Sequence, residues 1–252
     1  MTRFSAAVKL SALLLLSIVL AGGCSSSRDW TLSEGQQPGK FERVVTKTVG
    51  GRFLLYLPEG FNAARKRWPL MMFLHGSGER GSDLERVKVN GPPKFLGRQK
   101  DFQFIVVSPQ LPENDSWSSD VLNALLDELI ERLPIDTDQV YLTGLSLGGF
   151  ATWDFACDFP ERFAAIAPIC GRGDEDRACL LRNVPVWAFH GAKDPVVPLR
   201  DEEEMVNALK ACGGDVKFTI YPDAGHDAWT ETYANPELYK WFLGHRRHHG
   251  SH

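Results

Sequence analysis

Apolar and polar residues follow one another along the chain in blocks that predict a repeated succession of strands and helices. Short apolar runs of strand length occupy residues 69–75, 102–110, 162–170, 184–191 and 216–222. Longer segments with apolar residues at helical spacing occupy residues 118–133, 199–212 and 235–243. Buried strands that alternate with helices favour an α/β fold, with a mostly parallel central sheet and helices on both faces.

The first part of this pattern differs from the rest. Residues 41–49 and 52–58 have strand-like composition and are separated by Gly50 and Gly51. This arrangement predicts a β-hairpin that turns at the two glycines. The hairpin would add N-terminal antiparallel strands to one edge of the parallel sheet.

One turn in the pattern carries a candidate nucleophile. In "VYLTGLSLGGFATW", residues 140–153, Ser146 has Gly144 two places before it and Gly148 two places after it. A serine in G-x-S-x-G is a nucleophile when a strand precedes it and a helix follows it, because the tight turn then exposes its hydroxyl.

The flanks of Ser146 predict this context. Residues 139–143 are β-branched and aromatic, which indicates a buried strand. Residues 147–159 carry apolar side chains at helical spacing and end at Pro160. A serine hydroxyl also needs a base, so a histidine and its partner should follow other strands of the same sheet.

His226 and Asp194 meet this requirement. Asp194 follows the strand predicted at 184–191, and His226 follows the strand predicted at 216–222. The order Ser146, Asp194, His226 is the order of an α/β-hydrolase triad. His226 is then the general base, and Asp194 orients it. Asp201 and Asp223 are the alternatives to Asp194.

The turn after the strand at 69–75 is the expected source of an oxyanion hole. One backbone donor is the amide of Leu147, which directly follows the nucleophile. The second is expected from Ser77, with Gly76 allowing the backbone to approach the substrate closely.

Several stretches together resemble a known group of enzymes. They are "LHGSGERG", "SPQLPENDSW", "GLSLGGFATW", "APICG", "FHGAKDPVVP" and "YPDAGHDAW". They resemble α/β-hydrolase esterases of the dienelactone-hydrolase-like or predicted-peptidase group. They are also similar to the feruloyl and acetyl esterases of carbohydrate esterase family 1 and to polyhydroxybutyrate depolymerase-like lipoproteins. Dienelactone hydrolases proper use a cysteine, whereas this chain has Ser146.

The resemblance implies a serine esterase that cleaves short acyl, acetyl or feruloyl esters, including esters of polysaccharides, without a cofactor or metal. Trp117 and Trp229 are candidate walls of the substrate site, because aromatic rings stack on sugars and phenolic groups; structural packing is the alternative for both. The alternative functions are a serine peptidase of the prolyl-oligopeptidase type and a catalytically silent binding protein. We expect a monomer.

Charge and cysteine content add two expectations. The formal net charge of −4 gives no indication of nucleic-acid binding. Beyond Cys24, the cysteines are Cys157, Cys170, Cys179 and Cys212, which allow three pairings. A bridge between Cys170 and Cys179 would brace the loop between them, and the alternative is that Cys157 and Cys212 are simply small buried hydrophobic residues.

The chain ends predict export. Residues 1–23 have the pattern of a signal peptide, and "AGGC" resembles a lipobox that would place a lipid on Cys24; cleavage near Ala21 is the alternative. A lipid-anchored tether at 24–40, an α/β-hydrolase domain at 41–244 and a polar tail at 245–252 would follow. We therefore expect an enzyme held on the bacterial envelope, at the outer membrane, that contacts the membrane only through its anchor.

Overall fold

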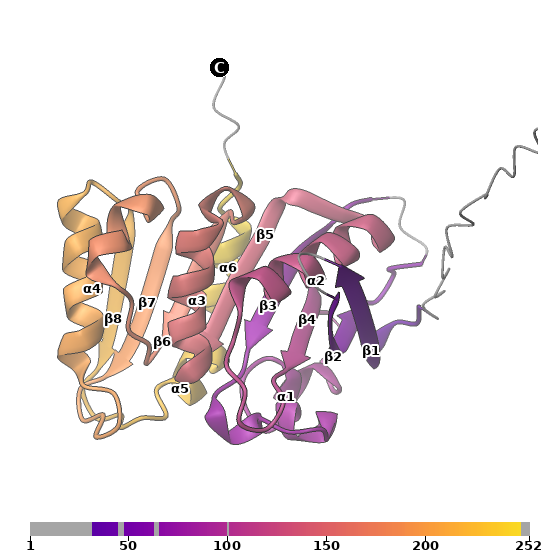
Figure 1. Ribbon diagram of the computed structural model, residues 1–252, viewed down its shortest axis with the longest axis horizontal. Coiled ribbons are helices and arrows are strands. Elements are labelled where there is room, and N and C mark those ends of the chain that lie inside the picture. The colour runs from indigo at the N-terminus through magenta and orange to yellow at the C-terminus, as the bar shows by residue number, and fades with distance from the viewer. Residues whose placement is uncertain (1–31, 45–47, 63–65, 100, 248–252) are drawn as a thin grey trace, which may run out of the picture. The chain divides into compact units, whose positions relative to one another are not determined.

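Eight strands form one sheet in the computed structural model, which describes residues 32–44, 48–62, 66–99 and 101–247 (Figure 1). The strands are β1 (Gly35–Val44), β2 (Thr48–Leu57), β3 (Trp68–Leu74), β4 (Ile105–Gln110), β5 (Ile135–Leu145), β6 (Ala165–Ile169), β7 (Val186–Gly191) and β8 (Val216–Tyr221). The α-helices are α1 (Pro93–Leu96), α2 (Ser119–Arg132), α3 (Leu147–Asp158), α4 (Leu199–Ala211), α5 (Trp229–Ala234) and α6 (Pro236–Leu243). Short 3-10 turns η1 (Ser77–Glu79), η2 (Leu84–Lys88), η3 (Pro160–Arg162) and η4 (Glu175–Leu181) occupy the loops.

The strand order in the sheet is β1-β2-β4-β3-β5-β6-β7-β8. The six strands from β4 to β8 run parallel, whereas β2 pairs antiparallel with both β1 and β4. This arrangement confirms the predicted fold class, including the antiparallel hairpin at the edge. Because the parallel strands all end at one edge, the loops that follow them meet there.

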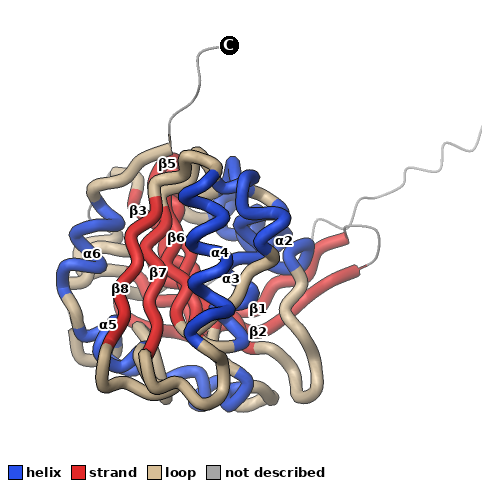
Figure 2. Tube along the Cα trace, turned by 90° about the vertical axis from the view of Figure 1, so that its left-hand side faces the viewer, coloured by secondary structure: helices blue, strands red, loops and turns tan. Residues whose placement is uncertain are grey.

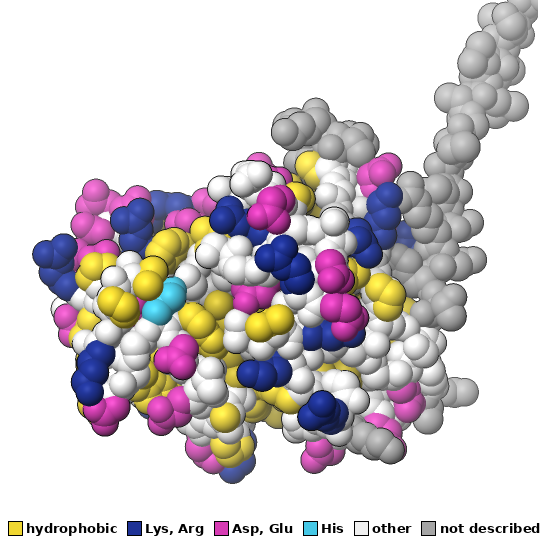
Figure 3. All heavy atoms as spheres, turned by 90° about the horizontal axis from the view of Figure 1, so that it is seen from below, with side chains coloured by type: hydrophobic (Ala, Val, Ile, Leu, Met, Phe, Trp, Pro, Cys, Tyr) yellow, Lys and Arg dark blue, Asp and Glu magenta, His cyan; other side chains and the backbone are white. Residues whose placement is uncertain are grey.

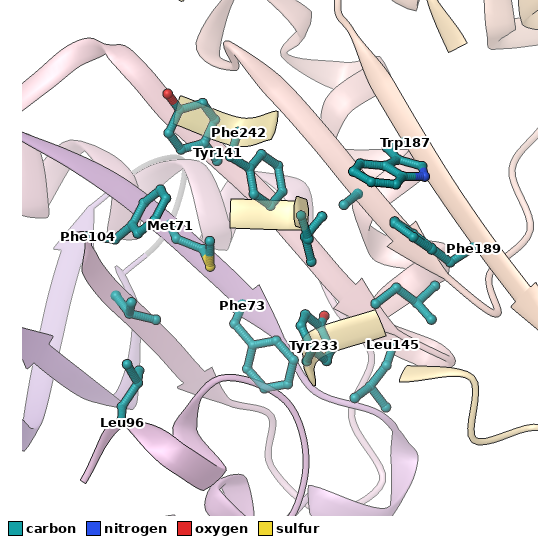
Figure 4. Packing of buried hydrophobic residues seen from close by; sticks show 14 of the residues in the cluster. Met71, Phe73, Leu96, Phe104, Tyr141, Leu145, Trp187, Phe189, Tyr233 and Phe242 are labelled. Carbon is teal, nitrogen blue, oxygen red and sulfur yellow. The ribbon is translucent and has the colours of Figure 1, made fainter. Parts of the chain in front are cut away.

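Helices cover both faces of the sheet (Figure 2): α2, α3 and α4 lie on one side, and α5 and α6 lie on the other. The buried cluster on the α5–α6 side is rich in aromatic rings (Figure 4). The ring centroids of Tyr141 on β5 and Phe242 on α6 lie 5.0 Å apart. The rings of Phe73 on β3 and Tyr233 on α5 pack edge-on with their centroids 5.6 Å apart. These rings fix the closing helices against the strands that carry the candidate site.

The hairpin does not turn where the sequence predicted. Gly50 and Gly51 lie inside β2, opposite Glu42 and Phe41 of β1, and the connection falls at residues 45–47, outside the described residues. A Cβ on Gly50 would stand 2.8 Å from the carbonyl oxygen of Phe41. These glycines therefore serve close approach of two strands instead of a turn.

The predicted tether also differs from the structure, because β1 begins at Gly35 instead of near residue 41. Its polar residues, with Pro38 and Gly39, led to the prediction of a linker. Pro38 is accommodated because β1 is an edge strand, and the ring of Phe53 occupies the space where Gly39 would carry a Cβ. The signal segment, Cys24 and the first part of the tether lie outside the described residues. No helix in the described residues is both long and apolar enough to cross a membrane.

The first residues of the predicted polar tail are attached to the domain. The carbonyl of His245 accepts a hydrogen bond from the Tyr141 hydroxyl at 2.9 Å. Arg246 pairs with Asp136 at 3.0 Å, and the amide of Arg247 donates to the carbonyl of Asp138. The end of the described chain is thereby held against the first part of β5.

The predicted bridge between Cys170 and Cys179 is wrong, because Cys179 is bonded to Cys212 with a Cα–Cα distance of 5.3 Å. Cys170 is fully buried at the end of β6, where its sulfur faces His190 and Asp194. Cys179 instead lies on the exposed turn η4, which packs against α4, and Cys212 lies at the end of that helix. The alternative, that Cys157 and Cys212 are small buried residues, is confirmed for Cys157, which is free and buried, and is wrong for Cys212, which forms the disulfide.

We expect Cys212→Ala to lower the free energy of unfolding by about 3–4 kcal/mol, because the bond closes a loop spanning 33 positions. Urea denaturation with and without reductant measures this difference. Cys170→Ala is the control for the identity of the bonded cysteines. This variant should keep one disulfide, detectable by peptide mapping under non-reducing conditions. Loss of the disulfide in that variant would contradict the assignment.

Candidate active site

Ser146 occupies the sharp turn between β5 and α3, with φ of 52° and ψ of −119°. A positive φ is uncommon for a residue with a side chain and costs about 1–3 kcal/mol. The neighbours hold it there: the Ser146 amide donates to the carbonyl of Ile169 at 2.9 Å, and the Phe150 amide donates to the Ser146 carbonyl at 3.0 Å. The turn therefore projects the hydroxyl from the edge where the parallel strands end.

The two glycines of G-x-S-x-G are sterically required. A Cβ on Gly144 would stand 2.3 Å from the carbonyl oxygen of Gly148. A Cβ on Gly148 would stand 2.0 Å from the carbonyl oxygen of Leu74 and 2.7 Å from that of His75. The start of α3 thus packs directly on the end of β3.

The structure brings Ser146, His226 and Asp194 together in one hydrogen-bonded chain. His226 Nε2 lies 2.8 Å from Ser146 Oγ, and His226 Nδ1 lies 2.7 Å from Asp194 Oδ2. The Asp194 side chain is fully buried, and the His226 side chain is 20% exposed. The His226 ring can therefore be reached from solvent, whereas the Asp194 carboxylate is shielded.

Asp194 is held as a carboxylate. Its Oδ1 accepts hydrogen bonds from the amides of Val196 and Val197 at 2.8 and 2.9 Å. Burial opposes its ionisation, but the bond with His226 and these two amides outweigh burial and lower the pKa of Asp194. An ionised Asp194 accepts the Nδ1 hydrogen of His226, which leaves Nε2 free to accept the proton of Ser146.

The two other aspartates considered from the sequence lie elsewhere. Asp223 is 90% exposed and pairs with Lys193 at 2.6 Å. Asp201 belongs to the first turn of α4. Neither has a contact with His226 among those found in the described chain.

The predicted oxyanion residues lie on the two segments that meet beside Ser146. Leu147 is the first residue of α3, so its amide has no partner within the helix. Gly76 precedes η1 and Ser77 begins it. Because Gly148 packs on the carbonyl of His75, the loop that carries Gly76 and Ser77 adjoins the start of α3. Their role as donors remains a prediction.

His75 supports this loop as a neutral group. Its Nε2 accepts from the amide of Leu111 at 3.0 Å, and its Nδ1 lies 2.6 Å from the carbonyl of Gly76. Burial lowers the pKa of His75 to about 4. Glu79, also buried, accepts from Asn90 at 2.6 Å behind the loop.

The two candidate substrate residues contact the site in different ways. The indole of Trp117 donates to the carbonyl of His75 at 3.3 Å and borders a cavity of about 530 Å³. Phe41, Gly51, Arg52, Asp115, Asp120 and Leu125 are among the other residues around this cavity. The Trp229 ring is edge-on to the His226 ring, with the centroids 5.1 Å apart, and it packs against the core. This position fits the alternative that Trp229 serves structural packing. Neither Ser146, Asp194 and His226 nor Gly76 and Ser77 are among the residues that line this cavity, and Trp117 connects it to the loop through its hydrogen bond to His75.

Two features of the site had no signal in the sequence. Glu202 is fully buried beside His190, although it belongs to the acidic run "DEEE", which is typical of a solvated helix face. Helix α5, which begins at Trp229, was also not predicted.

In the described residues, one group of side chains has the spacing of metal ligands: Cys170, His190 and Asp194, whose ligand atoms lie within 4.8 Å of one another. Burial raises the pKa of the Cys170 thiol, so the thiolate that a metal needs is disfavoured. Asp194 already binds His226 and two amides. The donor set therefore does not fit a metal.

The edge that carries the site is mixed in character (Figure 3), with hydrophobic side chains among charged ones of both signs.

The parallel sheet, the strained serine turn and the hydrogen-bonded chain to His226 and Asp194 define an α/β-hydrolase. Residues 102–238 match the model of the dienelactone hydrolase family, and the chain belongs to that family. A lactone is a cyclic carboxylic ester, and the protein is a carboxylic ester hydrolase.

Individual comparisons agree with this family. "Probable feruloyl esterase C" of Aspergillus terreus is 28% identical over 215 residues, covering 82% of this chain and 74% of that protein. The crystal structure of a thermostable esterase has a TM-score of 0.73 and 30% identity, over 84% of this chain and 64% of that one. The chain therefore spans just under two thirds of that esterase. Pyrococcus horikoshii acylaminoacyl peptidase, at 16% identity and a TM-score of 0.61 over 84% of this chain and 41% of its own, shares the fold.

We expect Asp194→Asn to lower kcat for ester hydrolysis by roughly three to four orders of magnitude. The asparagine amide would donate to Nδ1 of His226 and so place the ring hydrogen on Nε2, where it blocks proton transfer from Ser146. Steady-state kinetics on 4-nitrophenyl acetate measures the loss.

Asp223→Asn is the matched control, because this residue is exposed and pairs with Lys193 away from the His226 ring. It should keep the parent kcat. Equal losses in both variants would argue against Asp194 as the orienting group.

Proposed function

We propose that the protein is a serine esterase that works through an acyl-enzyme on Ser146. The observation that carries this proposal is the continuous chain from Ser146 Oγ to His226 and Asp194, with distances of 2.8 and 2.7 Å. Distances in this range are those of a nucleophile bonded to its base and a base bonded to its orienting group.

In the first half-reaction, Ser146 Oγ attacks the ester carbonyl carbon while His226 Nε2 takes the hydroxyl proton. The tetrahedral intermediate collapses, the ester C–O bond breaks, and His226 returns the proton to the departing alcohol. Water then repeats these steps on the acyl-enzyme, with His226 as base, and releases the carboxylic acid and free Ser146. Asp194 stays ionised throughout and stabilises the imidazolium.

The negative charge on the intermediate needs backbone donors. The amides of Leu147 and Ser77 supply them in this proposal, and Gly76 allows the loop to approach the substrate. Both segments are rigidly placed, because Gly148 packs on Leu74 and His75 and because His75 bonds to Leu111. Donors fixed before the reaction stabilise the developing charge without reorganisation.

The substrates in this proposal are short acyl, acetyl and feruloyl esters, including those carried by polysaccharides. The cavity beside Trp117 supports a substrate larger than a simple ester, because it offers aromatic, hydroxyl and carboxylate groups around a side chain that is bonded to the carbonyl of His75. Between α3 and Asp194 the chain forms only η3, β6, η4 and β7, so this segment carries no inserted cap domain, which supports access of such esters to Ser146. The relative named as a feruloyl esterase points to the same substrates.

The setting of the enzyme follows from its N-terminal sequence. In this proposal a lipid on Cys24 holds a monomeric domain on the bacterial envelope, at the outer membrane, and that lipid is its contact with the membrane.

Hydrolysis of methyl ferulate compared with 4-nitrophenyl acetate tests the function, with the domain freed of its first 24 residues. We expect cleavage of both, and we expect Ser146→Ala to remove the activity. Retention of ester hydrolysis by Ser146→Ala would overturn the proposal. Faster cleavage of a prolyl 4-nitroanilide than of either ester would favour the peptidase alternative.

Trp117→Ala should raise KM for methyl ferulate by about tenfold, the scale of one lost aromatic contact, and change KM for 4-nitrophenyl acetate little. Trp117→Phe retains a ring and should restore most of the binding. Equal increases for both substrates would show that the indole acts by supporting the loop at His75, to which it donates a hydrogen bond.

A further inference from the structure

A buried pair of ionisable side chains, His190 and Glu202, lies directly behind Asp194. His190, at the end of β7, and Glu202, on α4, are both fully buried. His190 Nδ1 lies 2.5 Å from Glu202 Oε2, and His190 Nε2 lies 2.9 Å from the carbonyl of Val197 and 3.4 Å from Asp194 Oδ2. Neither residue contacts Ser146 or His226 among the contacts that the described chain shows.

The hydrogen positions in this pair follow from its partners. The carbonyl of Val197 and the carboxylate of Asp194 only accept hydrogen bonds, so His190 Nε2 carries a hydrogen. The short contact between Nδ1 and Glu202 needs one more proton between two atoms that are otherwise both acceptors. With that proton the pair is neutral overall, whichever partner holds it.

This pair also fixes the loop that holds Asp194. The carbonyl of Val197 receives the His190 hydrogen, while the amide of the same residue donates to Asp194. Glu202 reaches back to α3, where Trp153 Nε1 lies 3.4 Å from Oε1. Helix α3 begins next to Ser146, so the pair links the helix of the nucleophile to the loop of the aspartate.

We propose that His190 and Glu202 form a positioning unit that holds one proton behind Asp194 and so keeps its carboxylate aligned with His226. The proposal rests on the proposed serine mechanism. When the proton leaves at alkaline pH, the pair becomes negative next to the buried Asp194. The charge then lies on the Glu202 carboxylate, across the His190 ring from Asp194, and its repulsion of the buried Asp194 carboxylate weakens the alignment of Asp194.

The pKa shifts of the pair and of the groups that face it favour a proton held between His190 and Glu202. Burial raises the pKa of Glu202 to about 7, against the opposing bonds from His190 and Trp153. Burial opposes a charged His190, but the bond to Glu202 outweighs it and raises the pKa of His190. Asp194 and Cys170 also face the pair, and burial keeps the Cys170 thiol protonated. Both shifts within the pair favour retention of the proton at neutral pH.

Two substitutions at Glu202 separate positioning from simple structural support. Glu202→Gln can donate to Nδ1 and accept from Trp153, so it keeps the bonds but removes the titrating proton. Glu202→Leu removes the bonds and leaves Nδ1 without a partner. Glu204→Gln is the matched control, because Glu204 is an exposed residue of the same helix that pairs with Arg200.

The experiment is a profile of kcat from pH 5 to 10 for the parent and these variants, with uncatalysed hydrolysis subtracted and folding checked by circular dichroism. Glu202→Leu should lower kcat by roughly 10- to 100-fold with little change in KM, as expected for misplacement of a catalytic group. Glu202→Gln should restore most of kcat at pH 7 and should lack the alkaline decline shown by the parent and by Glu204→Gln.

An alkaline decline in Glu202→Gln equal to that of the parent would overturn the proposal, and this result decides the question even where Glu202→Leu fails to fold. A folded Glu202→Leu variant whose kcat equals that of the parent would also overturn the proposal. Ser146→Ala distinguishes failure of the serine mechanism from failure of the positioning proposal. Full activity in Ser146→Ala would refute the serine mechanism itself, whereas the Glu202 results leave that mechanism standing.

Discussion

The close approach of α3 to the end of β3 is the constraint on which the site depends. Because Gly148 has no side chain, the first turn of α3 rests on the carbonyls of Leu74 and His75. This contact places the start of the helix next to the loop that carries Gly76 and Ser77 and forces the turn that strains Ser146. The strain, about 1–3 kcal/mol, is small beside the burial of the strands around it, so the fold maintains it.

From this contact the remaining groups are placed by the sheet. Parallel strands deliver Asp194 from the end of β7 and His226 from the end of β8 to one edge. The aromatic cluster under α5 and α6 then fixes the loop that carries His226, because Tyr233 and Phe242 anchor the helices that follow it. The Asp194 side chain is thus held by buried packing, whereas Ser146 and His226 are partly exposed.

The sequence predicted the parts of the structure that local chemistry determines. The strand, tight turn and helix around Ser146 follow from glycine spacing and apolar periodicity, and Asp194 and His226 follow from their places after strands. The Cys179–Cys212 bridge could not be predicted, because spacing along the chain does not show which way η4 turns its cysteine. Glu202 was missed for a similar reason: in an acidic run, only the helix face decides which carboxylate is buried. Gly50 and Gly51 had the composition of a turn, but the partner strand across from them gives them another role.

The attachment of the chain end to β5 has a practical consequence. Residues 245–247 are bonded to Tyr141, Asp136 and Asp138 at the edge of the sheet where the parallel strands begin, whereas Ser146 lies at the edge where they end (Figure 1). Anything joined beyond residue 247 therefore departs from the side opposite Ser146. A protein immobilised on a surface through that end would present Ser146 outward, to insoluble material that cannot diffuse to it.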